Sequence, residues 1–400
     1  MSQLAWPTFA FVAATLLALL LRAILLSALR RWSGPDGRGA LAQAIRLPSV
    51  LWSIVLGLWV GTEVASQTER LPLRVSQQIS LVLSSQATAL WHLHVTFGFG
   101  VGFAAGAFLT PLSATATKWF TSNRGLALGI ISAGGGAGML LLSPLTRWIT
   151  SAYDWRVAMI VLGDLAWLIV IPVALLVKNA PADMGAVALG GAATRQRDFS
   201  TREVLRAPQF WAIALTHFAC CAAHAGPIFH MVTHAIDQGV AAMVAATVLG
   251  VSGLASIGGR IACGMIADRF GAKPTLLVGL ALQAVMVFAY LFTRETASFY
   301  AAAVMFGISY GGVMPLYALV TREYFGEKIM GSAYGAVFLI STLGMGLGSW
   351  AGGYIHDAFG TYAWLFISSA AIGLMAMVLA LTFRAPRLVA GTRPATAGAR

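Results

Sequence analysis

Residues 264–273 read Gly-Met-Ile-Ala-Asp-Arg-Phe-Gly-Ala-Lys. This charged stretch lies between two apolar segments, about 240–266 and 274–293, each long enough to cross a bilayer. Gly264 permits two helices to approach closely, and Gly271 permits a tight turn between them. The stretch therefore predicts a short loop that joins two transmembrane helices.

The charges of this loop suggest a contact that depends on conformation. The Asp268 carboxylate can accept hydrogen bonds from the N-terminus of another helix, or it can pair with a neighbouring arginine. Arg269 and Lys273 supply cations close by. Such a gating loop can hold one conformation of a membrane protein and release it in another. The alternative is that the loop only sets the membrane topology.

The composition of the whole chain is typical of a membrane protein. Its 400 residues are 58% hydrophobic and 10% charged, with a mean hydropathy of +0.79. Soluble domains carry about 25% charged residues, so a soluble enzyme, a nucleic-acid-binding domain and a disordered chain are excluded. Each span with its connection needs about 30–35 residues. The length therefore predicts an all-α polytopic membrane protein with about 11–13 spans.

Twelve apolar segments follow one another along the chain. They cover about 4–29, 47–66, 77–90, 93–115, 125–147, 156–177, 209–233, 240–266, 274–293, 298–321, 331–354 and 363–383. A polar, basic stretch divides them, so we expect an N-terminal helix bundle at 1–177, a cytoplasmic central loop at 178–207 and a C-terminal bundle at 208–383. The basic tail 384–400 is rich in Pro, Gly and Ala, which predicts disorder.

An internal repeat supports the division into two halves. Gly125-Leu-Ala-Leu-Gly129 and Gly331-Ser-Ala-Tyr-Gly335 lie 206 residues apart, and each follows an aromatic pair. Two similar halves around a basic loop are the plan of a two-bundle secondary transporter.

The basic residues predict the sidedness. If the central loop and the C-terminal tail are cytoplasmic, fifteen Lys and Arg residues after about residue 90 lie inside, and three lie outside (Arg147, Arg156 and Arg294). This asymmetry follows the positive-inside rule. The net charge of +12 is then a topology signal, not a nucleic-acid-binding surface.

Ionisable residues inside the predicted spans are candidates for a binding site. Arg260 lies in the eighth segment, where its guanidinium can bind a carboxylate through two hydrogen bonds. Its distance from the end of the segment suits snorkelling to the membrane surface equally well. Asp164, in the sixth segment, is a candidate proton carrier or a structural carboxylate.

The seventh segment contributes histidines. His217 and His224 are two helical turns apart and share a face, and His230 follows further along. A histidine can hydrogen-bond a substrate or titrate near neutral pH. His224, His230 and Tyr310 of the tenth segment are candidates to line a substrate cavity, and simple packing is the alternative for each.

The sequence shows no pattern that indicates an enzyme or a metal site. The cysteines Cys220, Cys221 and Cys263 lie in apolar segments without metal-ligand spacing. No set of nucleophile and base is evident. The glycine-rich run 134–138 lies within a span, without the strand and turn of a phosphate loop. We expect no enzymatic activity, metal, cofactor or nucleic-acid partner.

From about 84 to 383 the chain resembles the oxalate/formate antiporter and monocarboxylate transporter branch of the major facilitator superfamily. Besides the loop at 264–273, the resemblance rests on Trp119-Phe-Thr-Ser-Asn-Arg-Gly-Leu-Ala-Leu-Gly129, Tyr153-Asp-Trp-Arg156, Gly258-Gly-Arg260, and Glu323-Tyr-Phe325 followed by Gly331-Ser-Ala-Tyr-Gly335. It implies two six-helix bundles that work by alternating access, with Arg260 binding the substrate carboxylate. Some members that take dicarboxylates carry a lysine where Ser341 stands here, so the resemblance implies a monocarboxylate.

The first fifth of the chain departs from this family. Subtracting 206 from the loop positions leads to residues 58–67, which lack the Asp-Arg pair and the final base. Residues 1–80 weakly resemble the N-terminal helices of small mechanosensitive channels instead. The arginines between residues 30 and 46 favour eleven spans, whereas the family plan requires twelve.

These observations predict a carrier of small organic anions, coupled to a proton or a counter-anion. We expect a monomer in the lipid bilayer of a bacterial inner membrane. The alternatives are a non-transporting membrane protein with a chimeric N-terminus that acts as a scaffold, and a channel.

Overall fold

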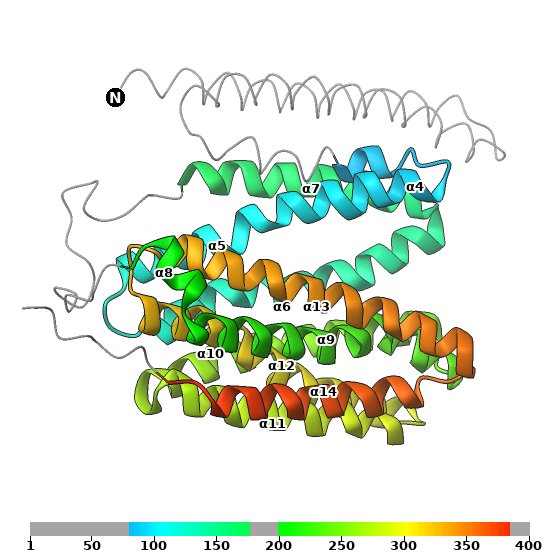
Figure 1. The fold of residues 1–400 in the computed structure, drawn as a ribbon. Coiled ribbons are helices and arrows are strands. Elements are labelled where there is room, and N and C mark those ends of the chain that lie inside the picture. The colour runs from blue at the N-terminus through cyan, green and yellow to red at the C-terminus, as the bar shows by residue number, and fades with distance from the viewer. Residues whose placement is uncertain (1–79, 177–198, 385–400) are drawn as a thin grey trace, which may run out of the picture. The chain divides into compact units, whose positions relative to one another are not determined.

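The computed structural model describes residues 80–176 and 199–384 (Figure 1). The predictions for residues 1–79, for most of the central loop and for the tail beyond 384 lie outside this range. The described chain forms the following helices: α4 (Leu90–Leu93), π-helical η1 (His94–Val101), α5 (Gly102–Trp119), α6 (Arg124–Ala152), α7 (Trp155–Leu176), α8 (Thr201–Arg206), α9 (Pro208–Asp237), α10 (Ala242–Phe270), α11 (Ala272–Ala289), 3₁₀-helical η3 (Tyr290–Phe292), α12 (Thr296–Phe325), α13 (Met330–Phe359) and α14 (Ala363–Leu381).

Seven of these helices are long and apolar enough to cross a membrane, by their length and composition. They are α6, α9, α10, α11 continued by η3, α12, α13 and α14. Each coincides with one of the apolar segments expected from the sequence, and the helical bounds extend a few residues beyond most of them.

The chain divides into two compact units, which are described separately. Of the described residues, the smaller unit comprises 80–101 and 152–168. Within it, Arg156 Nη2 donates to the Ala87 carbonyl at 2.9 Å, and the Ser84 hydroxyl donates to Thr96 Oγ1 at 2.9 Å. The first contact joins residue 87 to the start of α7, and the second joins residue 84 to η1.

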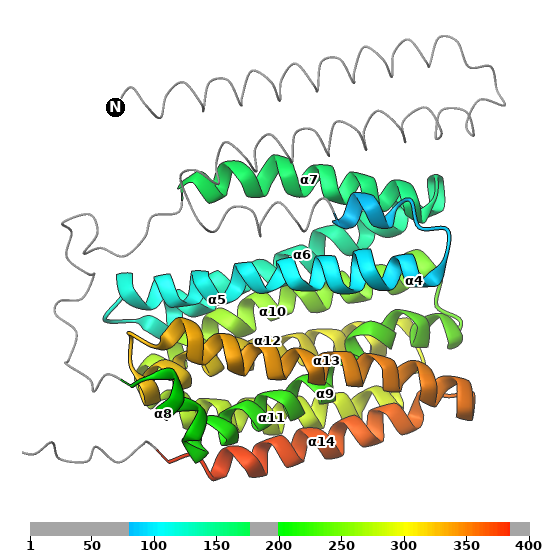
Figure 2. The same ribbon diagram turned by 45° about the horizontal axis from the view of Figure 1, so that its top comes forward.

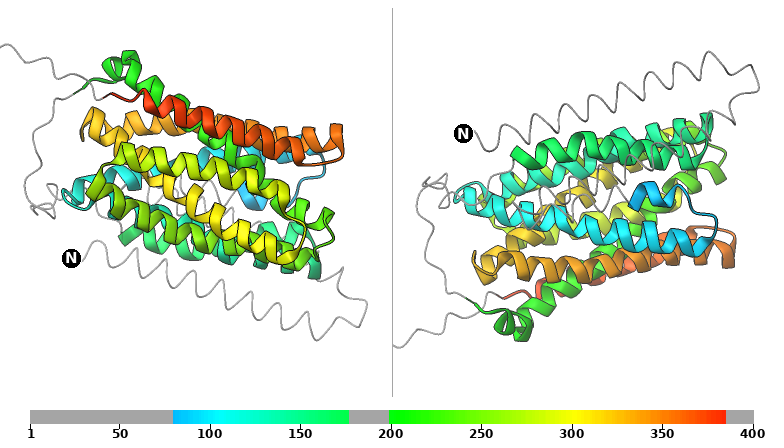
Figure 3. Two further views of the ribbon diagram at one scale, coloured as in Figure 1. Left: turned by 90° about the horizontal axis from the view of Figure 1, so that it is seen from below. Right: turned by 90° about the horizontal axis from the view of Figure 1, so that it is seen from above.

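Of the described residues, the larger unit comprises 102–151, 169–176 and 199–384, and it contains α9 to α14. In it α10 packs along α12, α9 packs along α13, and α14 contacts α9 and α11. Figure 2 shows α9 and α13 crossing each other, and Figure 3 shows the same group of helices from two further sides. Two buried apolar clusters fill the interior, one around Tyr317 and Val337 and the other around Phe299 and Phe366.

Local sequence explains where several helices begin and end. Ser200 and Glu203 form a capping box at the start of α8, and Pro208 occupies the first turn of α9. Gly271 and Gly326 follow α10 and α12 with φ of 90° and 86°, which side chains with a Cβ rarely adopt. The prediction that Gly271 makes a tight turn agrees with this backbone.

Candidate functional site

Arg260 of α10, Tyr310 of α12 and His224 of α9 lie together inside the larger unit. Their exposed fractions are 6%, 4% and 2%. The Arg260 Cζ atom lies 5.6 Å from the centre of the Tyr310 ring, within cation–π range, and the rings of His224 and Tyr310 are 5.5 Å apart. The structure therefore brings together three of the residues that the sequence proposed as substrate-binding.

The Arg260 guanidinium reaches α6, which belongs to the first half of the sequence. Its Nη1 atom donates to the Ser132 carbonyl at 2.5 Å. A Cβ atom placed on Gly135 would lie 3.0 Å from the same Nη1 atom. Tyr310 reaches α6 as well, because its hydroxyl donates to Met139 Sδ at 2.9 Å. Arg260 thus points into the protein, and the snorkelling alternative has no support in this geometry.

The charge of Arg260 has no carboxylate partner among the described residues. Its Nε atom is buried and has no hydrogen-bond acceptor within the same part of the chain. A buried cation without a counter-charge is unfavourable. The group is therefore suited to an anion that is not part of the described chain.

Two other candidates, His230 and Ser341, make hydrogen bonds of their own in the larger unit. His230 Nε2 is 2.9 Å from the Ser349 carbonyl, and the His230 ring lies 5.3 Å from that of Tyr362, next to the start of α14. Ser341 is buried on α13, and its hydroxyl donates to the Phe338 carbonyl at 2.8 Å. These contacts occupy the two side chains in helix packing.

Asp164 lies in α7, within the smaller unit, and its side chain is partly buried. Its role as a proton carrier stays a prediction. His217, which shares a face of α9 with His224, stacks on Tyr317 with ring centres 3.8 Å apart. Both ring nitrogens of His217 are buried without a hydrogen-bond partner among the described residues.

The gating loop makes the first of the two contacts that its sequence allowed. The Asp268 carboxylate accepts hydrogen bonds from the backbone N–H groups of Gly125 and Leu126, at 2.7 and 2.9 Å. It therefore caps the N-terminus of α6, where the helix dipole favours a negative charge. Gly264 meets Gly125 backbone to backbone, so closely that a Cβ on either residue would overlap the other.

The two cations of the loop have different surroundings. Lys273 Nζ donates to the carbonyls of Leu381 and Phe383, at 3.0 and 2.7 Å, and so satisfies the C-terminal end of α14. Arg269 is exposed at the last turn of α10. Only Lys273 is thus fixed to another helix in the described structure.

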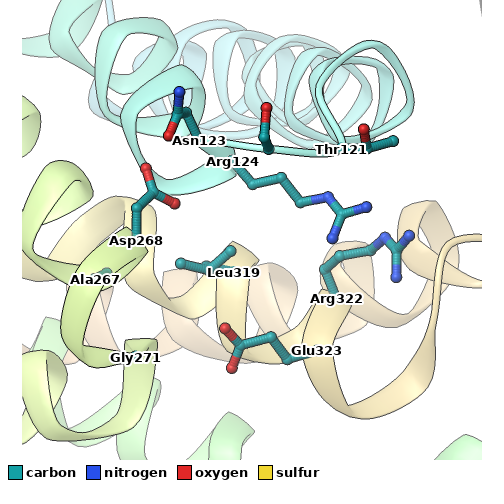
Figure 4. A pocket seen from close by; sticks show the side chains of 10 residues that line it. Thr121, Asn123, Arg124, Ala267, Asp268, Gly271, Leu319, Arg322 and Glu323 are labelled. Atoms are coloured by element: carbon teal, nitrogen blue, oxygen red, sulfur yellow. The ribbon is translucent and has the colours of Figure 1, made fainter. Parts of the chain in front are cut away.

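A cavity of about 640 Å³ opens beside this loop. Figure 4 shows Arg124 and Arg322 extending along it, with Asp268 and Glu323 on the facing helices. The Arg322 guanidinium also pairs with Glu327 at 2.8 Å. Charges of both signs from α6, α10 and α12 therefore meet at this end of the larger unit.

The sequence did not identify several residues of these sites. Arg322 and Glu323, opposite charges just beyond a predicted span, were a usable signal for the cavity. Ser132 and Gly135 gave no such signal. Ser132 acts through its backbone carbonyl, which every residue has, and Gly135 matters only because it has no side chain to contact Arg260.

Helices of membrane-spanning length surround the buried Arg260, which has no carboxylate partner among the described residues. This arrangement defines a polytopic membrane protein with an internal polar site. The family model of the Major Facilitator Superfamily matches residues 70–349 and 263–399. The chain belongs to the major facilitator superfamily, and the all-α, two-bundle fold expected for it is confirmed.

Three known proteins illustrate the relationship. Monocarboxylate transporter 11 of Homo sapiens is 28% identical over 74% of this chain and 64% of its own length, so the match spans less than two thirds of that relative. The oxalate:formate antiporter of Oxalobacter formigenes is 26% identical over 75% of this chain and 70% of its own length. The fucose:proton symporter of E. coli has a TM-score of 0.54 at 15% identity, covering 85% of this chain and 94% of its own.

The two sequence relatives belong to the branch that the motifs predicted, so that resemblance is confirmed. The symporter shows the fold alone. These relatives are transporters, in agreement with the prediction that the chain is not an enzyme.

Proposed function

We propose that the protein is a secondary transporter of small monocarboxylates that works by alternating access. The observation that carries this proposal is the buried Arg260, which has no carboxylate partner among the described residues. A substrate carboxylate supplies the missing negative charge and can accept two parallel hydrogen bonds from the guanidinium.

The surroundings of Arg260 favour a small substrate with one carboxylate. Tyr310 and His224 are the aromatic neighbours, and Arg260 is the one cation of this described group. A second carboxylate would lie in a buried region without a second positive charge, which is unfavourable. The similarity to monocarboxylate transporters supports the same substrate class. The similarity to an oxalate:formate antiporter supports small organic anions in general, because oxalate carries two carboxylates and formate carries one.

The Asp268 contact supplies the gate. When Asp268 caps α6, the ends of α6 and α10 are held together at the end of the unit that we assign to the cytoplasm. Release of this cap opens that side. Arg124, Arg322 and Glu323 line the cavity there, and they would exchange partners as the ends separate.

The driving ion is a proton or a counter-anion, and Asp164 is the proton-carrier candidate. Bacterial relatives support an inner-membrane location. We expect a monomer in the lipid bilayer, with the central loop and the C-terminus in the cytoplasm.

A second candidate function is a membrane protein that does not transport. The family match begins at residue 70, and residues 58–67 lack the loop signature that the repeat requires. If the preceding segments do not complete the first bundle, substrate has no closed pathway. Carboxylate binding without uptake would favour this candidate.

Uptake into proteoliposomes tests the proposal. We expect saturable uptake of a monocarboxylate such as formate, and a loss of about 30-fold or more in kcat/KM for Arg260→Ala, because removal of a buried charged partner costs about 2–5 kcal/mol. Arg294→Ala, which removes an exposed cation in the loop before α12, serves as the matched control and should transport normally. Equal transport by Arg260→Ala and the wild type would reject the assignment.

A further inference from the structure

The interface between α6 and α10 is built from residues without bulky side chains. Gly125 faces Gly264, Gly129 faces the Arg260 backbone, and Gly136 faces Gly253. At each position an added Cβ would overlap the backbone of the other helix. The two helices therefore touch over several turns, from the Asp268 cap toward the middle of the bundle.

The polar contacts along this interface have different strengths. At its end the Asp268 carboxylate accepts two backbone hydrogen bonds from α6. In its middle the Arg260 guanidinium donates to the neutral Ser132 carbonyl. Both a carbonyl and a carboxylate accept a charge-assisted hydrogen bond from the guanidinium, but a carboxylate adds an opposite charge and can accept two parallel bonds. A carboxylate therefore competes well with the carbonyl for the guanidinium.

We propose that the Ser132 carbonyl oxygen occupies the position that one substrate carboxylate oxygen takes when substrate binds. Substrate binding then exchanges the Arg260–Ser132 hydrogen bond for an Arg260–carboxylate bond. The loss of the bond to Ser132 loosens α10 from α6. The inference rests on the proposed function, in which Arg260 binds the carboxylate. It adds that α6 is part of the substrate site and that occupancy of the site is transmitted to the helix pair that carries the gate.

Gly135 is the positioning residue of this exchange. It lies one residue beyond Gly134 on α6, and a Cβ there would stand 3.0 Å from Arg260 Nη1. We expect a side chain at Gly135 to displace the guanidinium by a few tenths of an ångström and so to weaken its bond to the Ser132 carbonyl. Gly134 is a matched control, because nothing lies within 4 Å of a Cβ at that position. Both substitutions to Ala raise the intrinsic helix propensity of α6 by the same amount.

Hydrogen–deuterium exchange of the full-length protein provides the test. Sodium formate, compared with sodium chloride at equal concentration, should increase amide exchange over residues 126–139 of the wild type. Gly135→Ala should show the increased exchange without formate, and Gly134→Ala should resemble the wild type. The half-saturating formate concentration of Gly135→Ala should fall about tenfold, because formate no longer displaces a charge-assisted hydrogen bond.

The outcomes separate this inference from the proposed function. If formate raises the Tm of the wild type but leaves exchange over residues 126–139 unchanged or lower, the inference is wrong and the proposed function stands. Equal exchange in Gly135→Ala and Gly134→Ala also overturns it. If formate and other monocarboxylates fail to raise the Tm, the proposed function fails, while the ligand-free comparison of the two variants still decides whether Arg260 holds α10 to α6.

Discussion

A single residue, Asp268, joins the gating loop to the N-terminus of α6. It accepts hydrogen bonds from two backbone N–H groups in the first turn of α6. The N–H groups of a first turn have no acceptor within their own helix. Replacement by Ala leaves these donors to water and removes a favourable charge at the helix N-terminus. We expect Asp268→Ala to destabilise the conformation with this end closed by about 1–2 kcal/mol.

Cysteine-alkylation rates of a reporter at Ser122, which lines the cavity, measure this effect. They should increase in Asp268→Ala, because the closed conformation is less populated. Asp357→Ala is the control, since Asp357 is 87% exposed at the far end of α13. Equal alkylation in both variants would show that the cap does not hold this end closed.

At the scale of helices, close packing depends on rows of small residues. Gly344, Gly348 and Gly352 recur on α13, and the structure places the first two against the Phe218 and Ala222 carbonyls of α9. This row is therefore a packing face of α13 toward α9. Bilayer lipids are as apolar as the side chains, so close contact of backbones is a main source of helix association.

Substitution of single glycines on α13 tests this packing. Gly348→Ala places a methyl group into the α9 backbone, so we expect a loss of about 1–3 kcal/mol in stability. Gly346→Ala, where a Cβ meets open space, should be neutral or slightly stabilising. Thermal unfolding of the purified variants in detergent gives the comparison, and a similar Tm for both would argue against the packing role of Gly348.

For the whole molecule, the number of spans decides whether the first half can complete a transport pathway. The positive-inside rule favours a cytoplasmic loop around Arg38 and hence eleven spans. We expect topology reporters fused at residue 38 to report the cytoplasm and those at residue 72 the outside. A reporter at residue 384 should report the cytoplasm. If the reporter at residue 38 is external and the one at residue 72 is cytoplasmic, the protein has the twelve spans of the family. That result would contradict the hypothesis of a chimeric N-terminus.

The sequence by itself determined the long apolar helices of the described chain, the membrane class and the family, whereas α8 lies inside the expected central loop 178–207. These follow from local properties: an apolar run of sufficient length must satisfy its own backbone in lipid, and a Gly–Asp–Arg–Gly loop joins two such runs. The importance of Arg260 was also predictable, because a guanidinium within an apolar run is unfavourable unless it has a partner.

Only the tertiary structure decided which partners the candidate residues meet. In the folded bundle Arg260 contacts Tyr310 and the Ser132 carbonyl, and Tyr310 contacts His224. His230 contacts the Ser349 carbonyl. A span that is apolar on all sides carries little information about which face meets which neighbour. The rotation and close approach of helices are set by glycines on both partners, and such pairings between distant segments exist only once the bundle has packed.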